Sequence, residues 1–122
     1  MSERRGVLLK KSFDFAVRVV KLYTHLCNDK KEYVLSKQLL RSGTAVGALV
    51  REAQNAESKP DFIHKLGIAQ KECDETLYWL ELLKKTEFLT VEQFDSISLD
   101  ASALLKMIRS SILTTKKNHL TH

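Results

Sequence analysis

The amino-acid sequence predicts an all-α protein, an antiparallel four-helix bundle whose consecutive helices run up, down, up and down. Hydrophobic residues recur at intervals of three and four along most of the chain, as on one face of an amphipathic helix. Short polar segments separate four such stretches, and short connections place consecutive helices antiparallel. The length of 122 residues suits one domain. We expect an ordered core over residues 8–113 and a frayed tail over residues 114–122.

The first helix is expected from about Leu8 to Asn28 and carries two adjacent hydrophobic stripes. One consists of Leu9, Phe13, Ala16, Val20, Tyr23 and Cys27, and the other of Phe15, Val19, Leu22 and Leu26. The core of a single bundle needs only one such stripe. The additional apolar face therefore predicts contact with another subunit.

The second helix contains the stretch around which the fold is organised, S-G-T-A-V-G-A-L-V-R-E-A from Ser42 to Ala53. A glycine inside a helix costs about 1 kcal/mol relative to alanine, so Gly43 and Gly47 need a compensating contact. Being four residues apart they share one helical face, which lets another backbone approach closely. The core positions of this helix are expected to be Leu35, Leu39, Val46, Val50 and Ala53.

Two helix start signals define the remaining helices. Ser58 is followed by Pro60 and Asp61, and Thr90 is followed three residues later by Gln93, which are typical of helix N-termini. The third helix, Phe62 to Lys85, has the predicted core positions Phe62, Leu66, Ala69, Cys73, Leu77, Leu80 and Lys84. The fourth has Phe94, Ile97, Ala101, Leu104, Ile108 and Ser111 or Ile112. Its periodicity stops near Leu113.

The predicted topology gathers positive charge at one end of the bundle, which we name the basic pole. It is formed by the start of the first helix, the end of the second, the start of the third and the end of the fourth. Its basic residues are Arg4, Arg5, Lys10, Lys11, Arg51, Lys59, Lys65, Lys106, Arg109, Lys116 and Lys117, and its acidic residues are Glu3, Asp14, Glu52, Glu57 and Asp61.

Eleven basic against five acidic side chains give the basic pole a charge of +6, and the remaining nine and ten give −1, which together make the net +5 of the chain. A concentrated positive field favours polyanions, because each phosphate contact releases counterions. The alternative interpretation is a solvated surface that only keeps the protein soluble.

The sequence offers no pattern typical of an enzyme or of a cofactor site. Glu52, Glu72 and Glu75 lie on adjacent helices, but di-iron bundles need two Glu-x-x-His motifs, which this chain lacks. We expect Glu72 and Glu75 to pair with Arg41 or Arg51 instead, within the chain or across subunits. Tyr78 and Trp79 could stack on unpaired bases, although their helical spacing favours core or subunit contacts.

The remaining composition predicts a cytoplasmic protein that does not enter a membrane. No stretch approaches the roughly eighteen apolar residues of a membrane span, and the N-terminus carries no signal-peptide pattern. Cys27 and Cys73 are the only cysteines, and both fall on apolar stripes, where a free thiol behaves as a small hydrophobic group.

Two segments carry a family resemblance. They are Q-L-L-R-S-G-T-A-V-G-A-L-V-R-E-A and S-K-P-D-F-I-H-K-L-G-I-A-Q-K-E-C-D-E-T-L-Y-W-L-E-L-L, and the likeness extends from Lys11 to about Leu89. The chain resembles four-helix bundle proteins encoded within intervening sequences of bacterial 23S ribosomal RNA genes. Ala45 and Leu49 depart from the family pattern, in which serine and asparagine are common. It is also similar to the accessory proteins of diversity-generating retroelements, basic pentameric barrels that work with a reverse transcriptase and its RNA.

The resemblance and the charge leave two functional hypotheses. In the first, the protein is a homo-oligomer, a pentamer by resemblance, that binds nucleic acid through the basic pole, with RNA favoured over DNA. In the second, it is an interaction module or accessory scaffold whose partner is a protein such as a reverse transcriptase. The salt dependence of binding separates them, since phosphate contacts weaken steeply with salt and apolar contacts do not.

Overall fold

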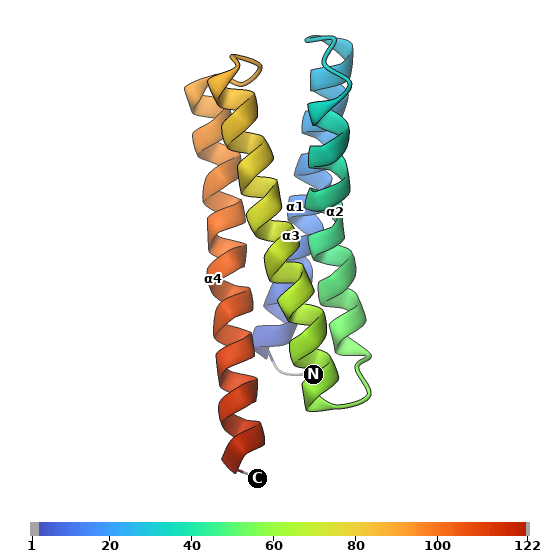
Figure 1. The fold of residues 1–122 in the computed structure, drawn as a ribbon, viewed down its shortest axis with the longest axis vertical. Helices are drawn as coiled ribbons and strands as arrows, with labels where there is room; N and C mark the ends of the chain where they lie inside the picture. Colours follow the sequence, from blue (N-terminus) through green and yellow to red (C-terminus); the bar gives the residue numbers. More distant parts are fainter. Residues whose placement is uncertain (1–2, 122) are drawn as a thin grey trace.

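The computed structural model describes the backbone of residues 3–121 and the side chains of residues 3–118. It contains α1 (Glu3–Asn28), α2 (Leu35–Gln54), α3 (Lys59–Lys85) and α4 (Val91–Thr121). Neighbouring helices run in opposite directions, and the N-terminus, the α2–α3 connection and the C-terminus lie at the same end (Figure 1). The predicted up-down-up-down bundle is confirmed. Helices α1 and α4 also contact each other and so close the bundle.

Both terminal helices are longer than the sequence predicts. Helix α1 begins at Glu3 instead of Leu8, and α4 continues to Thr121 instead of ending near Leu113. The two extensions contact each other, because Arg4 Nη1 donates a hydrogen bond of 3.0 Å to Thr114 Oγ1. The sequence predicts a frayed tail over residues 114–122, but the helix continues through residue 121. Residue 122 and the side chains from 119 onward lie outside the described part.

The end of α4 escaped prediction because its buried face is polar. Ser111 and Thr115 are both buried, although their hydroxyls interrupt the hydrophobic pattern. Thr115 Oγ1 donates a hydrogen bond of 2.8 Å to the Ser111 carbonyl oxygen. A hydroxyl satisfied by its own helix can be buried at little cost, so the helix continues where the apolar pattern has stopped.

The core face of α3 follows a regular heptad, with alternating steps of four and three residues. Its buried residues are Phe62, Leu66, Ala69, Cys73, Thr76, Leu80 and Leu83. The predicted core positions Leu77 and Lys84 were therefore wrong by one residue. Thr76 takes the core position because its hydroxyl donates to the Glu72 carbonyl oxygen at 2.8 Å and lies 3.0 Å from Ser42 Oγ.

Helices α1 and α2 approach each other closely at the two glycines of α2. A Cβ atom at Gly47 would lie 3.0 Å from the Ser12 carbonyl oxygen, and one at Gly43 would lie 2.7 Å from a Val19 methyl carbon. Both distances are tighter than nine in ten contacts of real Cβ atoms. The predicted close approach of another backbone is confirmed at Gly47, where the partner is α1, whereas Gly43 makes room for the Val19 side chain of the same helix.

This contact selects one of the two hydrophobic stripes of α1 for the core. Phe15, Val19 and Leu26 are buried, together with Leu8 and Ser12 on the same face. The other stripe stays on the surface, where the side chain of Phe13 is 54% exposed and that of Val20 is 45% exposed. The surplus apolar face predicted from the sequence is therefore present within a single chain.

The turn between α1 and α2 is built on a buried carboxylate that the sequence did not reveal. Lys31 has a positive φ of 56°, which brings the Glu32 side chain back over the start of α2. Its carboxylate accepts hydrogen bonds from the backbone N–H groups of Val34, Leu35 and Ser36, at 3.1, 2.8 and 2.7 Å. Glu32 thus satisfies donors that a helix leaves unpaired at its N-terminus.

The start signals of α3 and α4 act as predicted. The Ser58 hydroxyl accepts a hydrogen bond from the Asp61 backbone N–H at 3.2 Å. Thr90 and Gln93 form a reciprocal pair, in which each side chain accepts from the other residue's backbone N–H. These caps fix where the two C-terminal helices begin, and hence the length of the loops before them.

The glycine contact predicts opposite effects for two substitutions. Gly47→Leu should lower the free energy of unfolding by at least about 1 to 3 kcal/mol, because the larger side chain overpacks the α1 backbone. Gly67→Ala is the matched control, since a Cβ atom at Gly67 meets nothing within 4 Å and should stabilise the helix by up to about 1 kcal/mol. Urea unfolding measures both. An unchanged or increased stability of the Gly47→Leu variant would contradict the close approach.

Glu32 predicts a pH-dependent contribution to stability. Burial alone would raise the pKa of Glu32, but the backbone donors of Leu35, Ser36 and Val34 more than offset it and hold the pKa below the usual 4.5. Because its pKa is lowered in the folded state, the ionised Glu32 carboxylate stabilises the fold above pH 4.5. This stabilisation is lost as the pH falls through the lowered pKa and the carboxylate becomes protonated. Glu32→Gln should therefore cost about 1 to 2 kcal/mol at neutral pH and little in acid. Denaturant unfolding at both pH values tests this, and an equal cost at both would contradict it.

Candidate functional site

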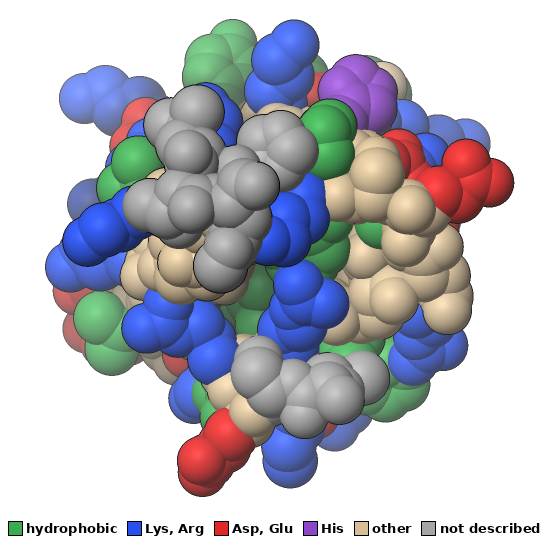
Figure 2. Space-filling model, turned by 90° about the horizontal axis from the view of Figure 1, so that it is seen from below, with side chains coloured by type: hydrophobic (Ala, Val, Ile, Leu, Met, Phe, Trp, Pro, Cys, Tyr) green, Lys and Arg blue, Asp and Glu red, His purple; other side chains and the backbone are tan. Residues whose placement is uncertain are grey.

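The basic pole lies at the end of the bundle where both termini and the α2–α3 connection meet (Figure 1). Seen along the helices from this end, Lys and Arg side chains lie in the middle and around the rim, and hydrophobic side chains are visible between them (Figure 2). The starts of α1 and α3 and the ends of α2 and α4 supply them. The last turns of α4 project beyond the α2–α3 connection (Figure 1) and carry Lys116 and Lys117 outward.

Three of the predicted basic residues are engaged in ion pairs. Lys10 Nζ lies 2.7 Å from an Asp14 carboxylate oxygen, and Lys65 Nζ lies 3.5 Å from Glu52. Arg109 is 4.0 Å from Asp74, a residue outside the basic pole. Exposed pairs of this kind contribute about 0 to 1 kcal/mol to stability, but each carboxylate reduces the positive potential beside it.

A second group of cations at this end is exposed and has no carboxylate partner within the described residues. Its members are Lys11, Lys59, Lys116 and Lys117, and Lys106, which lies near the middle of α4, is exposed and unpaired as well. Long lysine side chains without a fixed partner can follow the phosphates of a flexible polyanion. The four lysines at this end are therefore the part of the basic pole best suited to phosphate contacts.

Two arginines of the basic pole, Arg5 and Arg51, pack on aromatic rings. The Arg5 guanidinium carbon lies 4.1 Å from the centroid of the buried Phe62 ring, and that of Arg51 lies 5.7 Å from the Phe13 ring. A guanidinium over an aromatic face is attracted to its π electrons. These arginines therefore contribute to packing as well as to charge.

A pocket of about 380 Å³ opens between α1, α3 and α4 at this end. We name it the end pocket, and its lining residues are Arg4, Arg5, Phe62, Ser111, Thr114, Thr115 and Asn118. Sequence reasoning predicted only the two arginines. The others carry no signal of their own, because they meet only where α1 and α4 extend alongside the first turn of α3.

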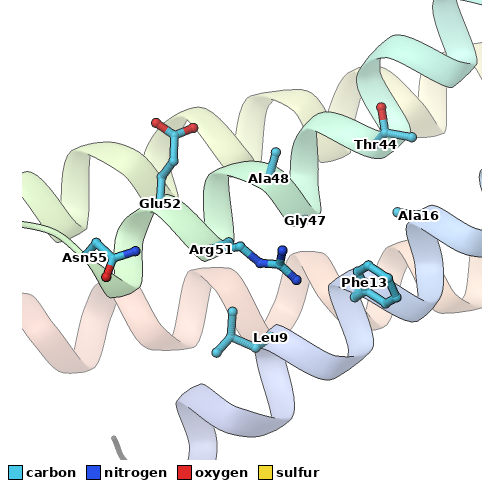
Figure 3. A pocket seen from close by; sticks show the side chains of 9 residues that line it. All are labelled: Leu9, Phe13, Ala16, Thr44, Gly47, Ala48, Arg51, Glu52 and Asn55. Atoms are coloured by element: carbon cyan, nitrogen blue, oxygen red, sulfur yellow. The ribbon is translucent and has the colours of Figure 1, made fainter.

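A larger groove of about 530 Å³ runs between α1 and α2. We name it the α1–α2 groove, and it is lined by Leu9, Phe13, Ala16, Thr44, Gly47, Ala48, Arg51, Glu52 and Asn55. Arg51 extends from α2 towards Phe13 of α1, whereas Glu52 points away (Figure 3). The glycine contact makes the groove narrow and mostly apolar, which is the character of a protein contact surface.

The carboxylates of α3 pair with arginine, as predicted. Arg41 reaches Glu72 at 2.9 Å and Glu75 at 2.6 Å, so the partner lies on α2 of the same chain. Glu75 also accepts a hydrogen bond of 3.2 Å from Trp79 Nε1. The hydrogen bonds from Arg41 and Trp79 hold the pKa of Glu75 below its usual value. Glu52 takes Lys65 as its partner instead.

The remaining candidates from the sequence lie apart from the basic pole. Tyr78 is exposed and packs edge-to-face with Trp79, which is itself half-buried against the core. Cys27 and Cys73 are both free thiols, and burial raises the pKa of Cys73 to about 12. Within residues 3–118, no group of three or more His, Cys, Asp or Glu side chains could hold a metal ion. No described helix is both long and apolar enough to cross a membrane.

Comparison with known proteins identifies what this chain is similar to. The family model described as 23S rRNA-intervening sequence protein matches residues 6–110. Among solved structures, the chain is similar to a protein of unknown function from the S23 ribosomal protein family of Bacteroides thetaiotaomicron VPI-5482. The two share 53% sequence identity and superpose with a TM-score of 0.88, over 89% of this chain and 97% of that one. No curated protein matches.

Proposed function

The chain belongs to the 23S rRNA-intervening sequence protein family, and from that premise we propose that it is a non-enzymatic, oligomeric bundle that binds structured RNA through the basic pole. The membership confirms the resemblance noted in the sequence. The observation that carries the proposal is the group of exposed, unpaired lysines at one end of the bundle, namely Lys11, Lys59, Lys116 and Lys117.

Phosphate is the chemical group that suits this surface. The end carries a charge of +6, from eleven basic and five acidic side chains, while the rest of the chain is close to neutral. Each lysine that neutralises a phosphate releases a condensed counterion, which makes the affinity depend steeply on salt. We favour RNA over DNA because the family takes its name from sequences within ribosomal RNA.

We further propose that the protein acts as a homo-oligomer, a pentamer by family resemblance. The supporting observation is the exposed hydrophobic stripe of α1, with Phe13 and Val20 about half exposed, beside the α1–α2 groove. When each subunit contacts the next through two different surfaces, the subunits form a closed ring if the rotation from one subunit to the next is a whole fraction of 360°. If the ring axis runs along the helices, the basic poles of all subunits face the same side and their fields add.

The same apolar surface supports the alternative function. A protein partner, for example a reverse transcriptase, could occupy the α1–α2 groove, and the positive charge would then be incidental. The groove is mostly apolar, so binding there would change little with salt. The two functions therefore differ in a property that one titration measures.

The oligomer predicts a molar mass well above that of the single chain. Light scattering of the purified protein at micromolar concentration should give a multiple of 14.0 kDa, five-fold for the pentamer. Val20→Glu, which places a charge on the exposed stripe, should reduce the mass without unfolding the helices, because burying an unpaired charge at an interface is costly. A mass of 14.0 kDa for the unaltered protein would contradict the proposed assembly.

The lysines predict the salt dependence of RNA binding. Replacing Lys59, Lys116 and Lys117 by glutamine should weaken binding of a hairpin RNA by an order of magnitude or more at low salt. It should also flatten the slope of log affinity against log salt by roughly 0.7 to 0.9 for each phosphate that the variant no longer neutralises. Arg4 and Arg5 are left unchanged in this variant, because Arg5 packs on Phe62 and Arg4 bonds to Thr114.

The matched control removes the same charge from the opposite end of the bundle. Lys30, Lys37 and Lys85 are exposed there and have no ion pair within the described residues, so their replacement by glutamine should change binding little. Equal weakening by both sets would show that only total charge matters and would contradict a localised site. Absence of RNA binding by the unaltered protein would favour the protein-partner function.

A further inference from the structure

The end pocket differs from the rest of the basic pole because it is a hollow between three helices that has arginines in its walls. Its walls come from three helices, with Arg4 and Arg5 on α1, Phe62 on α3, and Ser111 and Thr114 on α4. No carboxylate of the described side chains lines it. Its volume of about 380 Å³ is large enough for a small ligand such as one nucleotide and far too small for a duplex.

The donors that line the end pocket are held in place before any ligand arrives. Arg4 uses Nη1 to bond Thr114 Oγ1 at 3.0 Å, which fixes the guanidinium while leaving it other N–H groups. Arg5 is held against the Phe62 ring. A positioned guanidinium loses less conformational freedom on binding an anion than a free lysine does.

Ser111 is the second, independent indication of a ligand. The residue is only 6% exposed and lines the end pocket, yet its hydroxyl makes no hydrogen bond to any described residue. The Ser111 oxygen is not among the fully buried side-chain atoms that lack a partner, so it stays accessible from the pocket that the residue lines. An accessible hydroxyl in the wall of a pocket with two arginines can donate to a bound anion.

The position of the arginines has a cost that packing alone does not explain. Arg4 and Arg5 lie in the first turn of α1, where the positive end of the helix dipole disfavours cations. Residues whose charge is unfavourable at their position in a helix are expected at functional sites, where a bound ligand of opposite charge offsets the unfavourable energy. An anion bound between the two guanidinium groups would remove the unfavourable interaction.

The chemistry of the lining favours a terminal phosphate over an internal one. A phosphate monoester has three free oxygens and a charge of about −1.5 to −2 at neutral pH, whereas a phosphodiester has two free oxygens and a single charge. Two guanidinium groups and a serine hydroxyl match the monoester better in both charge and donor number. The recessed position also admits the end of a strand more readily than its middle.

We infer that the end pocket binds the terminal phosphate monoester of an RNA strand, through the arginines of α1 and the hydroxyl of Ser111. This inference rests on the proposed RNA-binding function and adds recognition of a strand end to it. The exposed lysines hold the body of the RNA by charge, and the end pocket distinguishes one kind of RNA end from another.

The test compares one hairpin RNA with single-stranded ends in three forms: with a 5′-phosphate, with a 3′-phosphate, and with hydroxyl groups at both ends. The unaltered protein should bind one phosphorylated form about tenfold more tightly than the hydroxyl form, or more, as one to two additional charged hydrogen bonds allow. The 5′ and 3′ forms show which end is recognised. Adenosine monophosphate alone is the fourth ligand, and it should bind far more weakly than the phosphorylated RNA.

Two variants locate the effect in the end pocket. Arg4→Gln and Ser111→Ala should each reduce the preference for the phosphorylated RNA to less than about threefold, because each removes a donor to the phosphate. Ser111→Ala breaks no side-chain hydrogen bond within the described residues, so it should keep the fold. Lys116→Gln is the contrasting variant, which should weaken all three RNA forms together and preserve their ratio.

Each outcome has a distinct meaning. Equal binding of all three RNA forms would overturn the end pocket inference while the RNA-binding function stands. A preference that survives both Arg4→Gln and Ser111→Ala would place recognition elsewhere and would also overturn it. Binding of adenosine monophosphate as tight as that of the RNA would show a nucleotide site instead of a strand-end site. No binding of any RNA would overturn both proposals.

Discussion

At Gly47, α2 lies so close to α1 that an added Cβ atom would be only 3.0 Å from the Ser12 carbonyl oxygen. The rest of the bundle depends on this contact. Because the two backbones approach at the face that holds Ser12, Phe15 and Val19, that face enters the core and the stripe containing Phe13 stays outside. The contact therefore creates both the α1–α2 groove and the exposed apolar surface proposed for assembly.

Sequence periodicity predicted the helices well and the positions of polar core residues poorly. The glycine face of α2 and the caps at Ser58 and Thr90 were predictable, because each rests on a local preference. Thr76 was not predicted as a core position, since a hydroxyl is counted as polar until its partner is known, and Ser111 was predicted only as an alternative to Ile112. The Glu32 carboxylate was likewise assigned to a polar loop, and only the positive φ at Lys31 explains how it becomes a cap.

The candidate site was predictable at the level of topology and not at the level of contacts. Helix order alone places most of the basic residues at one end. In an up-down-up-down bundle the starts of the first and third helices lie beside the ends of the second and fourth, and these segments carry the basic residues. This order does not show that Lys10 and Lys65 are paired with carboxylates, or that Arg5 packs on Phe62. Helix order also does not reveal the end pocket. Its walls meet because α1 and α4 extend beyond the residues that carry their hydrophobic patterns.

The central claim is that RNA contacts this protein at the basic pole, and mapping ultraviolet crosslinks in the organism's own cells tests it most directly. The protein is recovered after irradiation, digested, and analysed by mass spectrometry for peptides that carry a nucleotide. The account predicts such peptides from the starts of α1 and α3 and from the end of α4, including those around Lys59 and Lys116. Nucleotide-bearing peptides confined to the opposite end near Lys30 and Lys85, or none at all, would contradict it.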